Sequence, residues 1–194
     1  MRDERQIHLT SPIPPRPGAG ALRARTAEIL RVDHAGELAA VQIYRGQQAV
    51  FAAARGKDSA AREFAELGRQ EEDHLKAFEG LLAERGARPS LLSPLWRAAG
   101  FALGAATALI GEEAAHACTE AVESVIEEHY AGQVEELSAL EPELAGRLEG
   151  YRQDELAHHD KAVESGARDA PGYGLLSAVI RAGCRAAIKT AERV

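Results

Sequence analysis

The chain has few aromatic residues, few cysteines and no sustained run of alternating β-branched residues. Phe, Trp and Tyr make up 5% of its 194 residues, while alanine dominates an apolar fraction of 45%. This composition favours closely packed helices over a β-rich core. Two cysteines, Cys118 and Cys184, cannot form a disulfide framework, so we expect a reduced, intracellular protein.

Positive charge is also scarce. Lys and Arg number 23 against 30 Asp and Glu, which gives a formal net charge of −7. Phosphate contacts need a basic surface, so we expect no nucleic-acid partner. The longest uncharged stretch, residues 98–111, is shorter than the roughly 20 residues of a spanning helix. The N-terminus has early acidic residues and no apolar core region, so we expect neither a secretory signal nor a transit peptide.

Helical periodicity is plentiful. Apolar residues recur at intervals of three and four, and glycine and proline interrupt them at a few places. The expected helical regions cover residues 22–54, 59–85, 94–137, 142–165 and about 173 to the end of the chain. We predict an all-α protein, in which an extended, mobile arm (residues 1–21) precedes a single helical bundle domain (residues 22–194).

Two parts of the chain share a pattern of polar residues. A lone Glu is followed seven residues later by Tyr-x-Gly-Gln, first at Glu37 and Tyr44 and again at Glu123 and Tyr130. Each pattern is followed by a Glu-x-x-His, namely Glu71 with His74 and Glu155 with His158. A lone Glu on one helix and a Glu-x-x-His on the next, twice over, is how a four-helix bundle supplies ligands to two metal ions.

Helix geometry tests this pattern. Residues i and i+3 share one helical face, so each Glu-x-x-His can converge on one ion. In antiparallel helices joined by a short loop, residues equally far from the turn lie at the same height. Around a turn near residues 139–140, Glu123 is level with Glu155 and His158. Around a turn near Lys57, Glu37 matches its Glu-x-x-His less closely.

Two other acidic residues compete for the site. Glu113 and His116 form a third Glu-x-x-His, but it lies roughly 15 Å further along the axis and fails the height test. Glu120 shares the face of Glu123, and geometry alone does not exclude it; only the register of the repeat selects Glu123. The predicted metal ligands are Glu37, Glu71, His74, Glu123, Glu155 and His158.

Charge indicates what such a site holds. Four carboxylates inside a bundle need compensation, because burying each charge costs several kcal/mol. They bind protons at raised pKa or they bind cations, and two divalent ions neutralise four carboxylates. Mixed oxygen and imidazole ligands favour iron or manganese over zinc. We predict iron, because a pair of ferrous ions with open positions can reduce O₂.

Several residues near the motifs keep two interpretations. Asp33 and His34 are either partners of the ligands or plain surface residues, and Tyr44 and Tyr130 are either core tyrosines or radical or substrate groups. His129 is undecided, whereas His8, His116 and His159 are interpreted as surface residues. The apolar stretch around Trp96 and the last helix, residues 175–188, pack either on the bundle or on lipid, and we favour membrane contact.

The sequence resembles the demethoxyubiquinone hydroxylases, the di-iron, ferritin-like monooxygenases of ubiquinone biosynthesis. The resemblance rests on Arg31-Val32-Asp33-His34-Ala35-Gly36-Glu37, Ile43-Tyr44-Arg45-Gly46-Gln47, Glu71-Glu72-Asp73-His74-Leu75, Ala117-Cys118-Thr119-Glu120-Ala121-Val122-Glu123, His129-Tyr130, Asp154-Glu155-Leu156-Ala157-His158-His159-Asp160 and Ala182-Gly183-Cys184-Arg185. It covers nearly the whole chain after the N-terminal arm, and all six ligand positions of the family are occupied. It implies a ferritin-like antiparallel four-helix bundle with an extra apolar segment between helices 2 and 3 and a C-terminal fifth helix.

The resemblance also implies an activity. Two iron ions per chain, cycling between Fe²⁺ and Fe³⁺, would use O₂ and an external two-electron donor to hydroxylate a polyprenyl methoxy-methyl-benzoquinol. The family works as peripheral membrane proteins, often with other ubiquinone-biosynthesis proteins, and the short N-terminus suggests the cytoplasmic side of a bacterial cell membrane.

Three other classes of protein share part of the pattern. The strongest alternative is a ferritin-like iron-binding or peroxide-scavenging protein without an organic substrate, which would form a soluble oligomer. A di-iron hydroxylase of a modified tRNA base is disfavoured by the negative net charge. A helical interaction module without metal is the third.

Overall fold

The computed structural model describes residues 18–193, and these residues form helices and no strands. The elements in chain order are α1 (Ala19–Ala53), α2 (Asp58–Arg85), α3 (Ser93–Ile110), α4 (Glu112–Leu137), α5 (Pro142–Glu164), the 3₁₀ turn η1 (Ala167–Asp169) and α6 (Tyr173–Ala191). The prediction of an all-α protein is confirmed.

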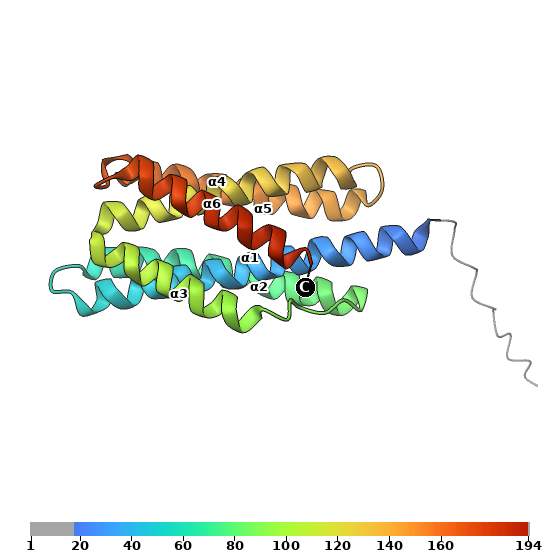
Figure 1. The fold of residues 1–194 in the computed structure, drawn as a ribbon, viewed down its shortest axis with the longest axis horizontal. Coiled ribbons are helices and arrows are strands. Elements are labelled where there is room, and N and C mark those ends of the chain that lie inside the picture. Colours follow the sequence, from blue (N-terminus) through green and yellow to red (C-terminus); the bar gives the residue numbers. More distant parts are fainter. Residues whose placement is uncertain (1–17, 194) are drawn as a thin grey trace, which may run out of the picture.

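Four of the helices form an antiparallel bundle. The hairpin of α1 and α2 lies beside the hairpin of α4 and α5 (Figure 1). The remaining two helices lie outside the bundle, with α3 packed along α1 and α6 crossing α4 towards α1. The predicted four-helix bundle with an extra apolar segment and a C-terminal helix is therefore correct, the segment being α3 and the last helix α6.

Helix α1 begins at Ala19, three residues before the start of the expected helical region 22–54, while residues 1–17 lie outside the described residues. The prediction of one continuous helical region over residues 94–137 was wrong. The helical region 94–137 is divided at Gly111, whose φ of 155° and ψ of 173° lie in a region that essentially only glycine adopts. This corner turns the chain from the outer helix α3 into the bundle helix α4.

Two of the buried apolar clusters lie on either side of a polar layer in the bundle. One cluster includes Leu30, Phe78, Leu137 and Leu148, and the other includes Tyr44, Phe51, Phe64 and Ala115. On α1, α2 and α4 the glutamate and histidine motifs lie between these two clusters, and on α5 the motif follows the residues of the first cluster. Burial of the two clusters thus holds the four helices around a charged centre, and the hydrophobic effect stabilises the bundle on both sides of it.

Glycines allow α3 to touch α1 backbone to backbone. A Cβ atom added at Gly104 would collide with the backbone oxygen of Ile43, and one at Gly100 would lie 2.6 Å from the backbone oxygen of Ala39. On the α1 side, a Cβ at Gly46 would collide with the backbone oxygen of Phe101. Gly46 of the first Tyr-x-Gly-Gln therefore allows α3 to pack closely against α1.

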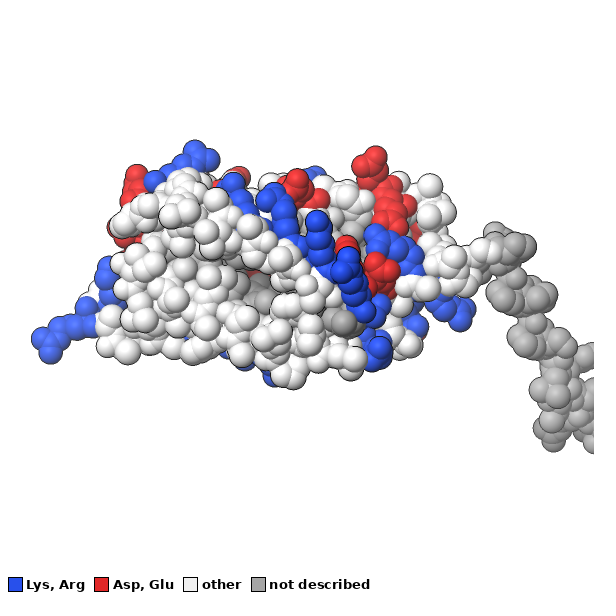
Figure 2. All heavy atoms as spheres, in the orientation of Figure 1, with Lys and Arg blue, Asp and Glu red and all other residues white. Residues whose placement is uncertain are grey.

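The outer face over α3 and α6 is largely apolar. Large exposed side chains there include Leu95, Phe101 and Leu109 on α3, and Leu175 and Val179 on α6. Figure 2 shows this face with few charged side chains over α3 and a row of Lys and Arg side chains over α6. Among the described helices, none combines the length and hydropathy that crossing a bilayer requires.

Candidate metal centre

The six predicted ligands lie together in the polar layer of the bundle. Two overlapping groups have potential ligand atoms that all lie within 4.8 Å of one another. The first contains Glu37, Glu71, His74 and Glu155, and the second contains Glu71, Glu123, Glu155 and His158. All six residues are buried. Because Glu71 and Glu155 belong to both groups, either of them could contribute an oxygen to each of two ion sites.

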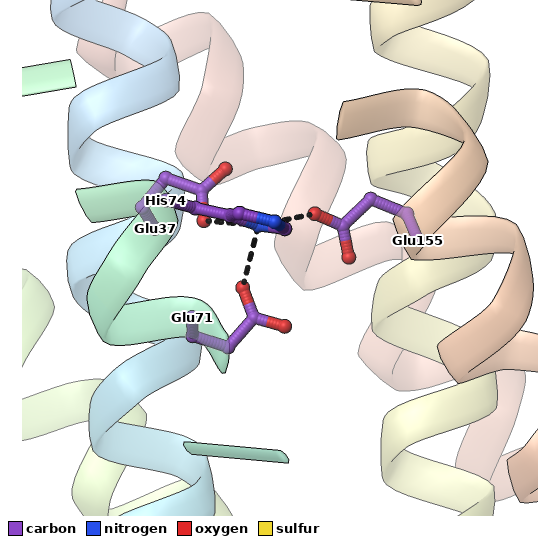
Figure 3. A group of neighbouring side chains, drawn as sticks. All are labelled: Glu37, Glu71, His74 and Glu155. Atoms are coloured by element: carbon purple, nitrogen blue, oxygen red, sulfur yellow. Dashed lines mark ion pairs between the residues drawn. The ribbon is translucent and has the colours of Figure 1, made fainter. Parts of the chain in front are cut away.

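The imidazole rings direct Nδ1 at the carboxylates. His74 Nδ1 lies 3.3 Å from Glu155 Oε1, 3.6 Å from Glu71 Oε2 and 3.7 Å from Glu37 Oε2 (Figure 3). His158 Nδ1 lies 2.9 Å from Glu71 Oε1 and 3.2 Å from Glu155 Oε2. Nδ1 is therefore the atom that each histidine offers to an ion.

Unpartnered atoms in this cluster fit metal ions. One oxygen of each of Glu37, Glu71, Glu123 and Glu155 and the Nδ1 of His74 are buried and form no hydrogen bond of good geometry among the described residues, although several of these atoms lie 2.9–3.7 Å from one another. A buried polar group without a partner costs about 1–3 kcal/mol, and more when it is charged. Oxygen and imidazole donors in this proportion suit iron or manganese. The residues present therefore fit a di-metal centre.

The ionisable groups of the cluster compensate one another's charge. Burial raises the pKa of Glu37 and of Glu123 well above the usual range, which favours their neutral forms. Burial disfavours a charged His158, but hydrogen bonds with Glu155 and Glu71 outweigh it and raise the His158 pKa to about 11. Burial likewise opposes ionisation of Glu71, yet the two histidines lower its pKa to about 2. Bound divalent ions would supply the positive charge that protonated histidines otherwise provide beside these carboxylates.

Each tyrosine of the repeat bonds the lone glutamate of the other half. The Tyr44 hydroxyl donates to Glu123 Oε1 at 2.7 Å, and the Tyr130 hydroxyl donates to Glu37 Oε1. Burial and the neighbouring carboxylates raise the pKa of both tyrosines well above the usual range, so both remain donors. The two tyrosines are thus core residues that also contact the candidate ligands.

A second buried polar group lies next to Glu37. Gln133 Nε2 donates to Asp33 Oδ1 at 2.7 Å, and His129 Nε2 lies 3.6 Å from the same oxygen and 2.8 Å from the Gln133 amide. Burial raises the pKa of Asp33. Asp33 and His129 line a small hollow together with Glu37 and Tyr130. The structure therefore places these two residues beside the candidate ligands.

His34 lies elsewhere. Its side chain is buried, its Nδ1 has no partner among the described residues, and burial lowers its pKa. The charged groups that act on its ring are Glu79 and Arg97, neither of which belongs to the ligand cluster. A role for His34 beside the metal ligands gains no support from this geometry.

The competing acidic residues lie outside the cluster. Glu113 is exposed, and His116 is buried with its ring centroid 4.9 Å from that of Phe64, so the interpretation of His116 as a surface residue was wrong. Glu120 is buried as well, but it bonds Arg181 on α6 and lies 3.5 Å from the half-buried His159. His8 lies outside the described residues. The register of the repeat, rather than the helical face alone, separates Glu123 from Glu120.

Two residues near the cluster were missed. His74 Nε2 lies 3.2 Å from Asp154 Oδ2, and His158 Nε2 lies 2.8 Å from Gln70 Oε1. Each partner directly precedes the Glu of the other Glu-x-x-His. Their position in the sequence could have identified both residues, because a residue directly before a ligand lies next to it on the helix surface. Both residues also line a polar hollow of about 260 Å³ between α2 and α5.

An apolar groove approaches the cluster from the opposite side. It has a volume of about 90 Å³ and is lined by α1 with Trp96 of α3, by α4 and by the second half of α6. The small hollow beside Glu37, about 30 Å³, shares Val32, Gly36, Ile126 and Ile188 with this groove. The groove and the hollow therefore adjoin, and Glu37 lines the hollow.

Comparisons with known proteins agree with this architecture. Residues 24–191 match the family described as "Ubiquinone biosynthesis protein COQ7". The "3-demethoxyubiquinol 3-hydroxylase" of Rhodospirillum rubrum is 46% identical over 178 residues, which cover 92% of this chain and 82% of that protein.

Two eukaryotic relatives extend the similarity. The human "NADPH-dependent 3-demethoxyubiquinone 3-hydroxylase, mitochondrial" is 45% identical over 176 residues, 89% of this chain and 79% of the relative. The Saccharomyces cerevisiae "5-demethoxyubiquinone hydroxylase, mitochondrial" is 41% identical over 181 residues, 86% of this chain and 77% of the relative. A family match over most of the chain and relatives well above 30% identity lead to one conclusion: this chain belongs to the COQ7 family of ubiquinone biosynthesis proteins.

Proposed function

We propose that this protein is a di-iron monooxygenase that hydroxylates the ring of a polyprenyl methoxy-methyl-benzoquinol, demethoxyubiquinol, in ubiquinone biosynthesis. The relatives carry the names of hydroxylases of this ring. The observation that supports the proposal most is the buried Glu and His cluster with unpartnered atoms at the inner end of an apolar groove. A metal centre and an apolar substrate thus meet at Glu37.

The reaction converts a ring C–H bond into C–OH. One atom of O₂ enters the ring and the other leaves as water, which requires two electrons and two protons from outside. Two bound iron ions would supply the means of reducing O₂. The human relative is named as NADPH-dependent, so NADPH is the two-electron donor that we would test first.

The side chains of this protein position and shield the reaction. Tyr130 fixes Glu37 by a hydrogen bond, and the apolar groove keeps bulk water away from the Glu37 side of the centre. Asp33 and His129 line the hollow beside Glu37, where they can hydrogen-bond the oxygens of a quinol ring.

The outer face over α3 and α6 fits the isoprenoid tail of the substrate and the surface of a membrane. The groove opens beside the exposed apolar side chains of α3 and α6, and an isoprenoid tail is apolar along its whole length. The Lys and Arg row over α6 suits anionic lipid headgroups (Figure 2). We propose peripheral binding to the cytoplasmic side of a bacterial cell membrane, where other ubiquinone-biosynthesis proteins are the expected partners.

Quinone profiling tests this function. Cells that lack the protein should accumulate demethoxyubiquinone, and the wild-type chain should restore the hydroxylated product. Glu155→Ala and His74→Ala should fail to restore it and should bind less iron than the roughly two ions of the wild type, with the helices still formed by circular dichroism. Glu113→Ala is the matched control, because Glu113 is an exposed residue outside the cluster.

The alternative, an iron-binding or peroxide-scavenging protein without an organic substrate, gives a different result. It predicts no quinone intermediate in the deleted strain and no use for the apolar groove. Full product formation by Glu155→Ala or His74→Ala would contradict the ligand assignment.

A further inference from the structure

The two candidate metal sites have the same kinds of ligands. Each would use one lone glutamate and one histidine, and both would share Glu71 and Glu155. The lone glutamates are also matched, because each accepts a hydrogen bond from a buried tyrosine. The ligands and the tyrosines therefore give no chemical reason for the two sites to differ.

The sites differ in the group behind each imidazole. His74 Nε2 faces a carboxylate oxygen of Asp154 at 3.2 Å, whereas His158 Nε2 faces the amide oxygen of Gln70 at 2.8 Å. The Gln70 amide nitrogen donates to Glu66 at 3.1 Å, which keeps its oxygen turned towards His158. Asp154 and Gln70 each face a candidate ligand, and the tyrosines do so as well. Among the described residues in such contacts, Asp154 and Gln70 are the pair whose chemical type differs between the two sites.

A carboxylate and an amide act differently on an imidazole. When a ring N–H donates to a carboxylate, the imidazole ring becomes more electron-rich. Its other nitrogen then becomes a stronger metal ligand. An amide oxygen carries no net charge and forms the weaker, neutral kind of hydrogen bond. Loss of such an outer partner typically weakens metal binding by about 10–100-fold. Asp154 is largely exposed, so we expect the lower end of that range.

We propose that Asp154 and Gln70 are positioning residues that make the two metal sites unequal, so that the ion held by His74 is bound more tightly than the ion held by His158. This inference rests on the proposed di-metal centre. The tighter site is the one that contains Glu37, and Glu37 lines the hollow at the inner end of the apolar groove. The more firmly held ion therefore faces the substrate.

Half-site variants test the inequality with cobalt(II) as the probe. Glu123→Ala keeps the site of His74, and Glu37→Ala keeps the site of His158. Cobalt(II) is titrated into metal-free protein and followed by its visible absorption. Asp154→Asn should raise the dissociation constant about tenfold in the Glu123→Ala protein and by less than about twofold in the Glu37→Ala protein.

The reciprocal substitution gives the matched control. Gln70→Glu should lower the cobalt dissociation constant in the Glu37→Ala protein and leave it nearly unchanged in the Glu123→Ala protein. If either residue had a merely structural role, its substitution would change the cobalt dissociation constant equally in the Glu123→Ala and Glu37→Ala proteins. In the otherwise unaltered chain, Asp154→Asn should weaken the tighter of two binding steps, which keeps the test valid if a half-site variant fails to fold.

The outcomes separate the two proposals. Equal effects of Asp154→Asn in both backgrounds, or no effect in either, overturn the inequality while two bound cobalt ions in the wild type support the di-metal centre. A wild-type chain that binds no cobalt overturns the centre itself and the inequality with it.

Discussion

The Glu37 side and the Glu123 side of the bundle share a sequence pattern but differ in their surroundings. Tyr44 packs against Phe64 and Tyr130 against Phe78 at similar ring-centroid distances of 6.5 and 6.3 Å, but the apolar groove and its inner hollow do not include Glu123. Near Glu37, both Glu37 and Tyr130 line the hollow that continues the groove. The repeated pattern thus provides the ligands twice and the apolar access once.

The glutamines of the repeat show the same divergence. Gln47 Nε2 donates to the backbone oxygen of Ala115 at 3.0 Å, whereas Gln133 Nε2 donates to the buried carboxylate of Asp33 at 2.7 Å. One amide ties two helices together, and the other holds a titratable group beside the hollow. Equivalent residues in the sequence therefore serve packing on one side and the candidate active site on the other.

The largest expected difference concerns the two glycines of the repeat. Gly46→Ala should destabilise the protein by about 3 kcal/mol, the upper end of the cost of overpacking, because the new methyl group would collide with the α3 backbone. Gly132→Ala should stabilise it by up to about 1 kcal/mol, since nothing lies within 4 Å of the added atom and alanine favours helix. Urea unfolding measures both, and equal changes would contradict the assigned role of Gly46.

The next difference concerns access to the Glu37 side. Ala187→Phe places a ring in the groove and should raise KM for a quinol with a long tail about tenfold, with little change for a ring without a tail. Ala186→Phe is the control, because Ala186 is exposed on the same helix and does not line the groove. Equal losses with both substrates would indicate that the tail does not occupy the groove.

A smaller difference separates the two tyrosines. Tyr130→Phe and Tyr44→Phe each remove one buried hydrogen bond to a glutamate, which should cost each variant about 1–2 kcal/mol of stability. The kcat of hydroxylation should fall about threefold to tenfold in Tyr130→Phe, because Glu37 faces the hollow, and less than about threefold in Tyr44→Phe. Steady-state kinetics and thermal unfolding distinguish these effects, and a greater loss of kcat in Tyr44→Phe would reverse the proposed substrate side.

The smallest effect concerns the thiols. Burial raises the pKa of Cys184, which lines the groove, to about 11 and that of Cys118 to about 12. Both are protonated at neutral pH, so alkylation of Cys184 should be slow and should rise about tenfold per pH unit below its pKa. A quinone analogue in the groove should slow the reaction further. Mass spectrometry follows each thiol, and faster labelling of the fully buried Cys118 would argue against this groove.

Much of the bundle followed from local features of the chain. The period of apolar residues predicted the helices, and the Glu-x-x-His spacing with the repeat register selected the six residues that the structure brings together. These features are readable because a helix has a constant rise and rotation per residue, so spacing along the chain converts directly into height and face. The corner at Gly111 was missed because a glycine inside an apolar stretch also fits a continuous helix.

Spacing along the chain therefore predicted most of the helices, their antiparallel pairing and the level of the candidate ligands. Packing between distant segments decided that Tyr44 and Tyr130 bond across the halves, that Asp154 and Gln70 lie behind the histidines, and that Glu37 lines the hollow beside the groove. This division follows from the range of the interactions. Hydrogen bonds within a helix connect near neighbours in the chain, whereas the rotation of each helix and the contacts between helices are decided by packing of side chains that are distant in sequence.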